Sequence, residues 1–240
     1  SAVVRNSSFE NGRGTQGGSV HVTSSASLDL YDSTFDANTA TEDGGGAAYV
    51  TGTLFGQGNT FDSNSSIDSD DNRGGGALRT NDDDADVTFV DTLFCSNTSS
   101  SDGGALLNRR NGDLDVERSI FWNNSTNSRG AVFYATSDAS GGGNPLFARV
   151  SAAANDSQSG DDDGWFIRNA HDNNENEYDH VSLDQCIVEV ANDSQWGIDR
   201  GWSVTDSMFS ANDILISPDG SQSGNDFSVT PSYAGNTCSR

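Results

Sequence analysis

The chain has 240 residues, a formal net charge of −24 and a mean hydropathy of −0.59. Gly, Ser, Asp and Asn make up nearly half of it, and its 12 basic residues are all arginine. A nucleic-acid-binding protein needs a cationic surface against the phosphates, so this charge balance excludes that class. The charge also argues against binding to an anionic membrane, and no apolar run approaches the ~18 residues of a spanning helix. Composition alone would suit a disordered chain.

A repeated Phe-x-x-Asn element excludes disorder, because it places apolar residues at regular intervals. A shortened copy, Phe9-Glu10-Asn11, opens the chain, and a hydrophobic residue stands five positions before most of the Phe residues, as Leu30 does for Phe35. Successive copies as far as Phe121 lie 26 to 33 residues apart. The full copies are Phe35/Asn38, Phe61/Asn64, Phe94/Asn97, Phe121/Asn124 and Phe209/Asn212.

A second element, Gly-Gly-Ala followed by Ala or Leu, comes after the early copies, at 45–48, 75–78 and 103–106. Between the motifs, short alternating apolar segments bounded by turn residues predict strands. Such strands cannot bury a core alone, but coils stacked about 4.8 Å apart pair their backbones and align their inward side chains. The repeat length therefore predicts an all-β fold, a right-handed parallel β-helix of about eight coils with three faces, as one domain over 1–240.

Each motif has a predicted place in this β-helix. We expect the Phe side chains to stack in the lumen and the repeat Asn amides to bond the coils above and below. The Gly pair would supply a tight turn with positive φ. Two stretches break the period, 136–163 and 169–180, and we expect them to form loops extruded from single coils. The first coil begins part-way through a repeat, so a preceding segment or a second subunit would cover it.

The paired motifs resemble the repeats of the polymorphic outer-membrane proteins and of the wider group of secreted bacterial right-handed β-helix proteins. The resemblance covers about residues 4–134 and, less closely, 164–216. It implies a passenger-type protein or adhesin that is exported and then anchored by a separate C-terminal segment. No C-terminal barrel, sorting signal or signal peptide is visible in this sequence, and we expect a processing site before Ser1.

Catalysis on a polysaccharide is the alternative function, since carboxylate pairs on a coil face can act as acid and base. The segment 160–164 faintly resembles the paired-Asp segment of polygalacturonase-type hydrolases, which makes Asp161 and Asp162 the candidate catalytic residues. The Gly-His-Gly and Arg-x-Lys elements of that family are missing, and an acidic surface loop is the simpler interpretation. The predicted function is a non-catalytic, structural or adhesive protein, secreted or on the cell surface, with a polysaccharide lyase or hydrolase as the alternative.

Calcium is the one cofactor that the acidic runs would suit, because they offer hard oxygen ligands. The candidates are Asp82, Asp84, Asp161 and Asp163. Neither an EF-hand nor a nonapeptide calcium repeat is present, so a solvated acidic face is the other interpretation. We predict no other cofactor.

The three cysteines, Cys95, Cys186 and Cys238, form no Cys-x-x-Cys motif. A Cys186–Cys238 disulfide in an oxidising compartment is one hypothesis, and three free thiols are the other. His171 and His180 lie in a polar run without a partner at metal-site spacing, and loop residues are the simpler interpretation of both.

The predicted partners are surface glycans or a second copy of the chain. Rods stacked head to tail would make an open filament. The net charge of −24 would keep isolated rods apart unless cations or high ionic strength screen the repulsion, so we expect assembly to strengthen with salt.

Overall fold

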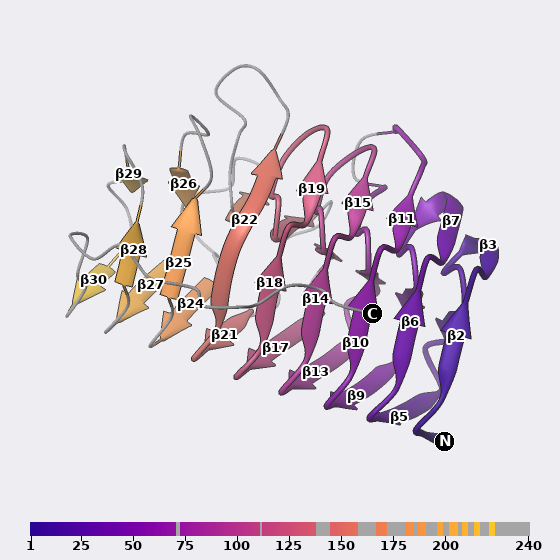
Figure 1. The fold of residues 1–240 in the computed structure, drawn as a ribbon. Helices are drawn as coiled ribbons and strands as arrows, with labels where there is room; N and C mark the ends of the chain where they lie inside the picture. The colour runs from indigo at the N-terminus through magenta and orange to yellow at the C-terminus, as the bar shows by residue number, and fades with distance from the viewer. Residues whose placement is uncertain are drawn as a thin grey trace.

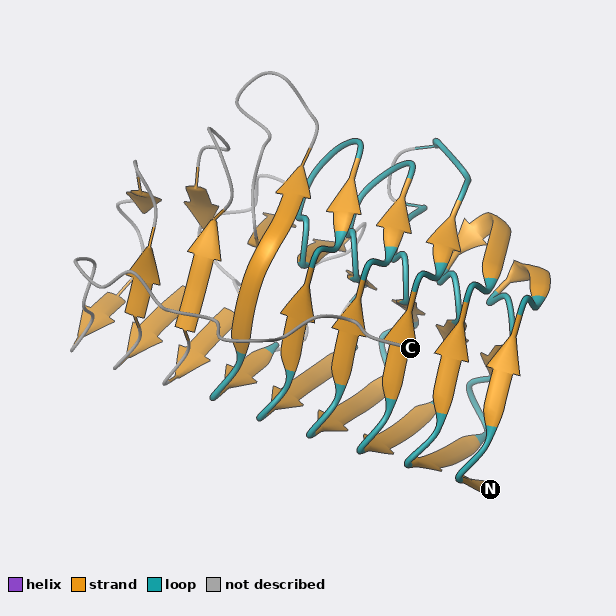
Figure 2. Cartoon of the chain, viewed as in Figure 1, coloured by secondary structure: helices purple, strands orange, loops and turns teal. Residues whose placement is uncertain are grey.

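A computed structural model describes residues 1–70, 73–110, 112–137 and 145–157, and beyond these the backbone of strands between 167 and 223. The strands stack into a parallel β-helix, which confirms the predicted fold, and about five turns are complete (Figure 1). Strands and the loops between them make up these ranges, which contain no helix (Figure 2). Accordingly, this part of the chain offers no helix that could cross a membrane.

Each complete coil passes through four short strands, one in each of four parallel sheets named A to D here. Sheet A has the order β1 (Ala2–Arg5), β5 (Ser27–Tyr31), β9 (Thr53–Gln57), β13 (Asp86–Val90), β17 (Asp113–Glu117), β21 (Leu146–Ala148), β24 (Val181–Asp184), β27 (Trp202–Thr205) and β30 (Ser221–Ser223). Sheet D contains β4 (Val20–Val22), β8 (Ala48–Val50), β12 (Leu78–Asn81), β16 (Leu106–Arg109), β20 (Phe133–Ser137) and β23 (Ile167–His171).

Sheets B and C share one long strand, β22 (Ser151–Ser157). Sheet C covers the residues between the repeat Asn and the Gly pair, a fourth strand where the sequence predicted three faces. Its other strands are β3 (Arg13–Gln16), β7 (Thr39–Gly44), β11 (Ser65–Ser66), β15 (Thr98–Ser99) and β19 (Ser125–Thr126). Sheet B also contains β2 (Ser8–Glu10), β6 (Thr34–Asp36), β10 (Thr60–Asp62), β14 (Leu93–Cys95), β18 (Ile120–Trp122), β25 (Ile187–Val190) and β28 (Met208–Ser210), whereas β26 (Trp196–Ile198) pairs with β29 (Ile214–Ile216).

Three corners of each coil are made by residues with a left-handed backbone. The first Gly of each Gly pair is one of them, and Gly75 has φ +77°. A Cβ at Gly75 would lie 2.2 Å from the carbonyl oxygen of Leu78, so this turn has no room for a side chain. The corner before sheet B uses Asn6, Asp32, Gly58, Asp91, Arg118 and Arg149, and the corner after it uses Asn11, Ala37, Ser63, Ser96 and Asn123.

The repeat Phe side chains form a continuous stack in the lumen. The rings of Phe35 and Phe61 lie 4.7 Å apart and within 6° of parallel, and those of Phe94 and Phe121 have the same spacing. All four are fully buried. Each buried Phe contributes about 1.5–3 kcal/mol of hydrophobic stabilisation. Phe209 lies in β28, where its side chain is outside the described residues.

The repeat Asn side chains form a second, polar ladder beside the Phe stack. In each coil Nδ2 donates to the Asn Oδ1 of the next coil, at 2.9 Å from Asn64 to Asn97 and from Asn97 to Asn124. Nδ2 also donates to a Phe carbonyl of the preceding coil, while Oδ1 accepts a backbone N–H. These amides are buried, so the ladder satisfies polar groups that water cannot reach. Asn212 lies outside the described residues.

The ladder departs from the predicted pattern at its first member, Asn38. Toward the next coil its Nδ2 donates to Oδ1 of Asn64 at 2.9 Å, as expected. Toward the preceding coil it bonds only to backbone, because Nδ2 donates to the Phe9 carbonyl at 2.9 Å and Oδ1 accepts from the Gly12 N–H at 2.8 Å. Gly12 stands where the later coils have the Asn, since Asn11 of the shortened copy makes the corner with φ 55°. The side-chain ladder therefore starts at Asn38.

Two changes of side-chain size preserve the packing of the lumen where the repeat varies. Phe89 fits because Gly56 precedes it in the same row of sheet A, and a Cβ at Gly56 would lie 2.6 Å from the Phe89 ring. Two coils further on, Ala152 stands at the Phe position, and the ring centre of Phe147 lies 6.2 Å from that of Phe121. The first change exchanges volume between neighbouring coils of one row and the second between two rows, and both keep the core filled.

Candidate functional site

The repeat residues that the sequence singled out lie inside the rod and are not part of a surface site. In the described coils every repeat Phe and Asn is 0% exposed: Phe35, Asn38, Phe61, Asn64, Phe94, Asn97, Phe121 and Asn124. Their predicted structural role agrees with this burial. Any site for a ligand must therefore be sought on the outer faces of the sheets.

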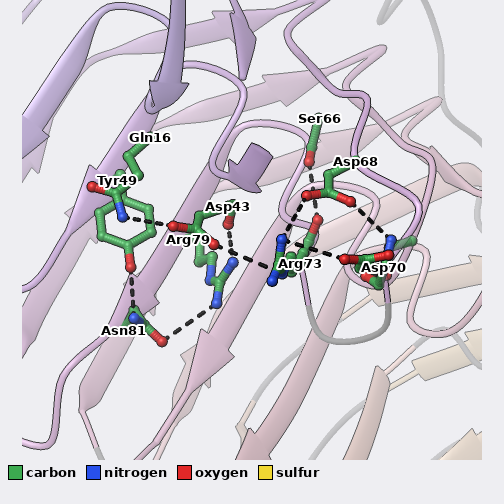
Figure 3. Close-up of polar contacts among 10 residues, drawn as sticks. Gln16, Asp43, Tyr49, Ser66, Asp68, Asp70, Arg73, Arg79 and Asn81 are labelled. Atoms are coloured by element: carbon green, nitrogen blue, oxygen red, sulfur yellow. Dashed lines mark hydrogen bonds and ion pairs between the residues drawn. The ribbon is translucent and has the colours of Figure 1, made fainter. Parts of the chain in front are cut away.

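The outer face of sheet D carries large side chains that are buried although they point away from the lumen. The register aligns His21, Tyr49, Arg79, Leu107 and Tyr134 in one row. All except His21 are at most 3% exposed. Segments that join sheets C and D contact this row, and the contacts around Arg79 are drawn in Figure 3.

Arg79 is the most unusual member of the row, since it is 0% exposed. One end of its guanidinium donates to the backbone carbonyl of Asp43, and Nη2 lies 3.4 Å from Oδ1 of Asn81 (Figure 3). The guanidinium also lies 5.6 Å from the centre of the Tyr49 ring. Among the described residues its Nε has no hydrogen-bond partner. Burial lowers the pKa of Arg79 to about 10, which still leaves it charged at neutral pH.

The neighbours of Arg79 are held by their own hydrogen bonds. Nδ2 of Asn81 donates to the Tyr49 hydroxyl at 2.6 Å, and Nε2 of Gln16 donates to the Asp43 carboxylate at 2.7 Å. Burial is the main cause of a raised pKa at Tyr49, so the phenol stays protonated at neutral pH. The group is therefore a fixed polar network and presents no ionised nucleophile.

A second arginine, Arg73, lies at the exposed edge of this network. It forms ion pairs with Asp68 at 3.2 Å, with Asp70 at 3.3 Å and with Asp43 at 3.8 Å (Figure 3). The hydrogen bond with Asp68 is the main cause of the raised pKa of Arg73. Its carbonyl oxygen accepts a hydrogen bond from Ser66. Arg73 is thereby linked to Asp43 in β7 and to Ser66 in β11.

Further along the same face, Arg129 pairs with a fully buried carboxylate. Its Nε and Nη2 donate to the two oxygens of Asp102 at 2.7 and 2.8 Å. The guanidinium also lies 4.8 Å from the Tyr134 ring centre. A buried carboxylate is costly unless it is paired, so this bidentate contact stabilises the segment between sheets C and D.

The outer face of sheet A has different chemistry, because it combines aromatic and acidic side chains. The Arg5 guanidinium lies 3.8 Å above the half-buried Tyr31 ring, and the Phe55 ring lies 5.8 Å from Tyr31. Two coils further, Asp86 pairs in register with Asp113, and Asp115 follows on the same face. The pKa of Asp115 is raised, first by partial burial and then by repulsion from Asp113 and Asp86.

The residues predicted for calcium binding or catalysis lie on turns or outside the described ranges. Asp82 and Asp84 follow β12, where the backbone N–H of Asp84 lies 3.5 Å from Oδ1 of Asp82. No three His, Cys, Asp or Glu side chains gather as a metal site in the ranges that the structure describes. Asp161, Asp162 and Asp163 lie outside these ranges, so the calcium and catalytic hypotheses stay predictions. His171 ends β23 with only its backbone described, and His180 is also outside.

The cysteine prediction needs a correction, because Cys95 is disulfide-bonded. The chain has three cysteines, so the partner is either Cys186 or Cys238, both outside the described residues. A bond at Cys95 uses one of the two and excludes the predicted Cys186–Cys238 pair. The sequence could not reveal that Cys95 is bonded, because the spacing of the cysteines does not determine which of them the fold brings together.

The sequence interpretation missed one more member of the Asn ladder and a second polar ladder, and both position the coils. The Asn ladder continues to Asn155, whose Oδ1 accepts from Nδ2 of Asn124 at 2.9 Å. The sequence signal for Asn155 was an Asn at the repeat interval after Asn124. It was missed because Ala152 stands where the Phe-x-x-Asn motif has its Phe. At the corner before sheet B, short polar side chains two residues before each Phe bond to the neighbouring coil, at Ser33, Asn59 and Ser119.

One comparison with known proteins gives a match. Residues 91–109 match the family described as the Chlamydia polymorphic membrane protein repeat. The matched segment contains β14, β15 and β16, with Phe94, Asn97 and the Gly pair at 103–104. Neither a curated protein nor a solved structure matches the chain significantly. The match therefore rests on one coil that holds both motifs.

Proposed function

We propose that this β-helix repeat protein, similar to the polymorphic membrane proteins, is a structural and adhesive protein of the cell surface. The observation that carries the proposal is the direction of the repeated side chains. The Phe and Asn that recur from coil to coil are buried and satisfy one another. The recurring chemistry thus builds a rod, and the outward positions vary from coil to coil. The repeat match at 91–109 supports a surface location.

The outer face of sheet A suits adhesion to surface glycans. An aromatic ring offers a flat apolar face on which a sugar ring can lie, while neighbouring polar groups bond its hydroxyls. Tyr31 and Phe55 supply two such rings on adjacent coils, and Arg5 beside them adds a cation that would attract an acidic sugar. The ligand class is therefore an anionic glycan.

A glycan array and binding curves with purified protein test this proposal. We expect the double variant Tyr31→Ala/Phe55→Ala to lose at least about tenfold in affinity, equivalent to about 1.4 kcal/mol. Ile67→Ala is the matched control, because Ile67 is another large apolar residue, 45% exposed, outside this face. Equal binding by both variants, or no binding by the wild type, would reject the adhesive role of this face.

Polysaccharide cleavage remains the second candidate, because one observation favours it. Asp86, Asp113 and Asp115 gather close to Phe55 on the same sheet, and the raised pKa of Asp115 is the direction that a general acid needs. The assay is release of reducing ends or of unsaturated products from acidic polysaccharides. Cleavage that disappears in Asp115→Asn would establish this alternative and overturn the non-catalytic proposal.

Self-association is a separate part of the proposal. Every coil adds to the previous one in parallel register, so a second copy could add to a terminal coil in the same way. The net charge of −24 opposes this contact, and salt weakens that opposition. We expect light scattering to show growing particles as ionic strength rises. A monodisperse monomer at high concentration and high salt would count against assembly.

A further inference from the structure

The outward charges of sheet A are distributed unevenly along the rod. Its strands β1, β5, β9, β13 and β17 lie side by side, and alternate residues of each strand point away from the lumen (Figure 1). Among the outward residues of these five strands, Arg5 in β1 is the single cation. The outward carboxylates are Asp29 in β5, Asp86 in β13, and Asp113, Asp115 and Glu117 in β17. The outer face of sheet A therefore has a cation at one end and most of its carboxylates at the other.

The cation lies beside the two aromatic rings of this face. The Arg5 guanidinium is 3.8 Å from the centre of the Tyr31 ring, and this cation–π contact holds the charge in place. The Phe55 ring centre lies 5.8 Å from that of Tyr31, one coil further along the rod. Asp29 pairs in register with Phe55, and a carboxylate accepts hydrogen bonds from sugar hydroxyls. An anion therefore fits at Arg5, and an uncharged sugar with free hydroxyls fits at Phe55.

The carboxylates at the other end of the face repel an anion. Asp86 lies one coil beyond β9, and Asp113 follows it in the same row. Asp115 is exposed on the next row, and the two charges that raise its pKa, after burial, are those of Asp113 and Asp86. Glu117 is compensated separately, because two arginines contact its carboxylate at 2.6 and 3.1 Å. Asp86, Asp113 and Asp115 therefore form an acidic group whose field extends toward Phe55.

We infer that the outer face of sheet A selects a glycan with one acidic residue, at its end, followed by neutral residues. The inference rests on the proposed adhesive function and narrows its ligand class. The terminal acidic sugar lies at Arg5, and the neutral residues extend along the rod over Phe55. Each coil advances about 4.8 Å, which is close to the length of one sugar residue. A glycan with an acid on every second residue would place further anions about 10 and 19 Å from Arg5, the last of them at β17 beside Asp115.

Repulsion determines this selectivity. Arg5 attracts the first acidic residue of either kind of glycan, so it does not distinguish them. The distinction comes from the acidic group at the far end, because like charges that face one another across a contact lower the affinity for the wrong ligand. Physiological salt screens charges beyond about 8 Å, so the carboxylates that an anion would touch directly act most strongly.

Titration calorimetry with three oligosaccharides of equal length tests the selectivity. One has a single terminal carboxylate, one has a carboxylate on every second residue, and one is neutral. We expect the wild-type protein to bind the first at least about tenfold more tightly than the second at about 0.15 M ionic strength. Equal or tighter binding of the second overturns this inference and leaves the adhesive function standing. If none of the three binds, the proposed function fails and this inference fails with it.

Variants then assign the selectivity to particular residues. In Asp86→Asn/Asp113→Asn/Asp115→Asn we expect the difference between the two acidic oligosaccharides to fall below about threefold, because the repulsion is removed. The affinity for the neutral oligosaccharide should stay at its wild-type value. Arg5→Gln should instead abolish the preference for the singly acidic oligosaccharide over the neutral one. If the triple variant keeps the tenfold difference, the acidic group does not select the ligand and the inference is wrong.

A matched control separates this local effect from the net charge of the protein. Glu10→Gln/Asp36→Asn/Asp62→Asn also removes three carboxylates, but from one outward row of sheet B. We expect this variant to keep the wild-type difference between the two acidic oligosaccharides. Equal loss of selectivity in both triple variants would attribute the selectivity to net charge and overturn the assignment to sheet A.

Discussion

The Asn ladder provides the sharpest test of how the rod is stabilised, and Asn97 lies at its centre. Its Oδ1 accepts from the backbone N–H and the Nδ2 of Asn64, and its own Nδ2 donates to the Phe61 carbonyl and to Asn124. Asn97→Ala removes these four hydrogen bonds together. The backbone N–H of Asn64 and one N–H of its Nδ2 then have no acceptor, in a residue that is 0% exposed.

The magnitude follows from those two donors. A buried donor left without a partner costs about 1–3 kcal/mol, so the variant should lose about 2–6 kcal/mol of its free energy of unfolding. That is a large share of the roughly 5–15 kcal/mol typical of a folded domain. The loss should exceed that of an ordinary cavity of the same small volume, because the unpaired groups are polar.

Urea unfolding followed by far-UV circular dichroism measures the change. Asn127→Ala is the matched control, because Asn127 is exposed and follows β19 in the same region. We expect a change within about 0.5 kcal/mol for the control. Since a solenoid can unfold in parts, hydrogen exchange in β14 and β15 should accompany the measurement. If Asn97→Ala loses less than about 1 kcal/mol and exchange is unchanged, the ladder is not what holds the coils together.

Three further substitutions test the corners, the outer face and the charge. Gly75→Ala should lose about 2 kcal/mol or more in thermal unfolding, since it adds a Cβ at φ +77°, whereas Ala37→Gly at φ 54° should lose little. Arg129→Gln removes both guanidinium hydrogen bonds from a buried carboxylate and should cost about 3–5 kcal/mol, whereas Arg73→Gln, at a partly exposed position, should lose much less. Asp115→Asn should raise Tm slightly at pH 7. The raised pKa of Asp115 means that its contribution is lost as pH rises through the folded pKa, so the gain should vanish below the ordinary Asp pKa of about 3.9.

The lumen could be predicted from the sequence because each coil repeats the same local requirements. A Phe must stack on the Phe of the next coil, and an Asn must bond its counterpart, so both recur at one interval. The sequence analysis missed the coil that contains Ala152, because the large lumen side chain of this coil is Phe147 in sheet A and not a residue at the motif position. Volume is conserved between rows of the lumen rather than at one position, and a motif search by position does not detect the exchange.

The outer contacts could not be predicted, because no repeat constrains them. Arg79 occupies a position held by Tyr49 and Leu107 in the neighbouring coils, and nothing in the spacing indicates that a guanidinium would be buried there. Its burial depends on the segment that carries Asp43, which belongs to an earlier part of the sequence. The pair of Arg129 and Asp102 likewise joins neighbouring coils.

The distribution of charge explains why an acidic chain can still form a close-packed stack. Parallel register places equivalent outward residues about 4.8 Å apart on successive coils, so a repeated Asp would create a column of like charges. In one row of sheet A the outward residue changes from coil to coil, in the order Asp29, Phe55, Thr88 and Asp115. Asp86 and Asp113 are like charges on adjacent coils, and their repulsion contributes, after burial, to the raised pKa of Asp115. Parallel stacking therefore favours similar residues at inward positions, where apolar side chains pack on one another. It favours different residues at outward positions, where identical charges would repel.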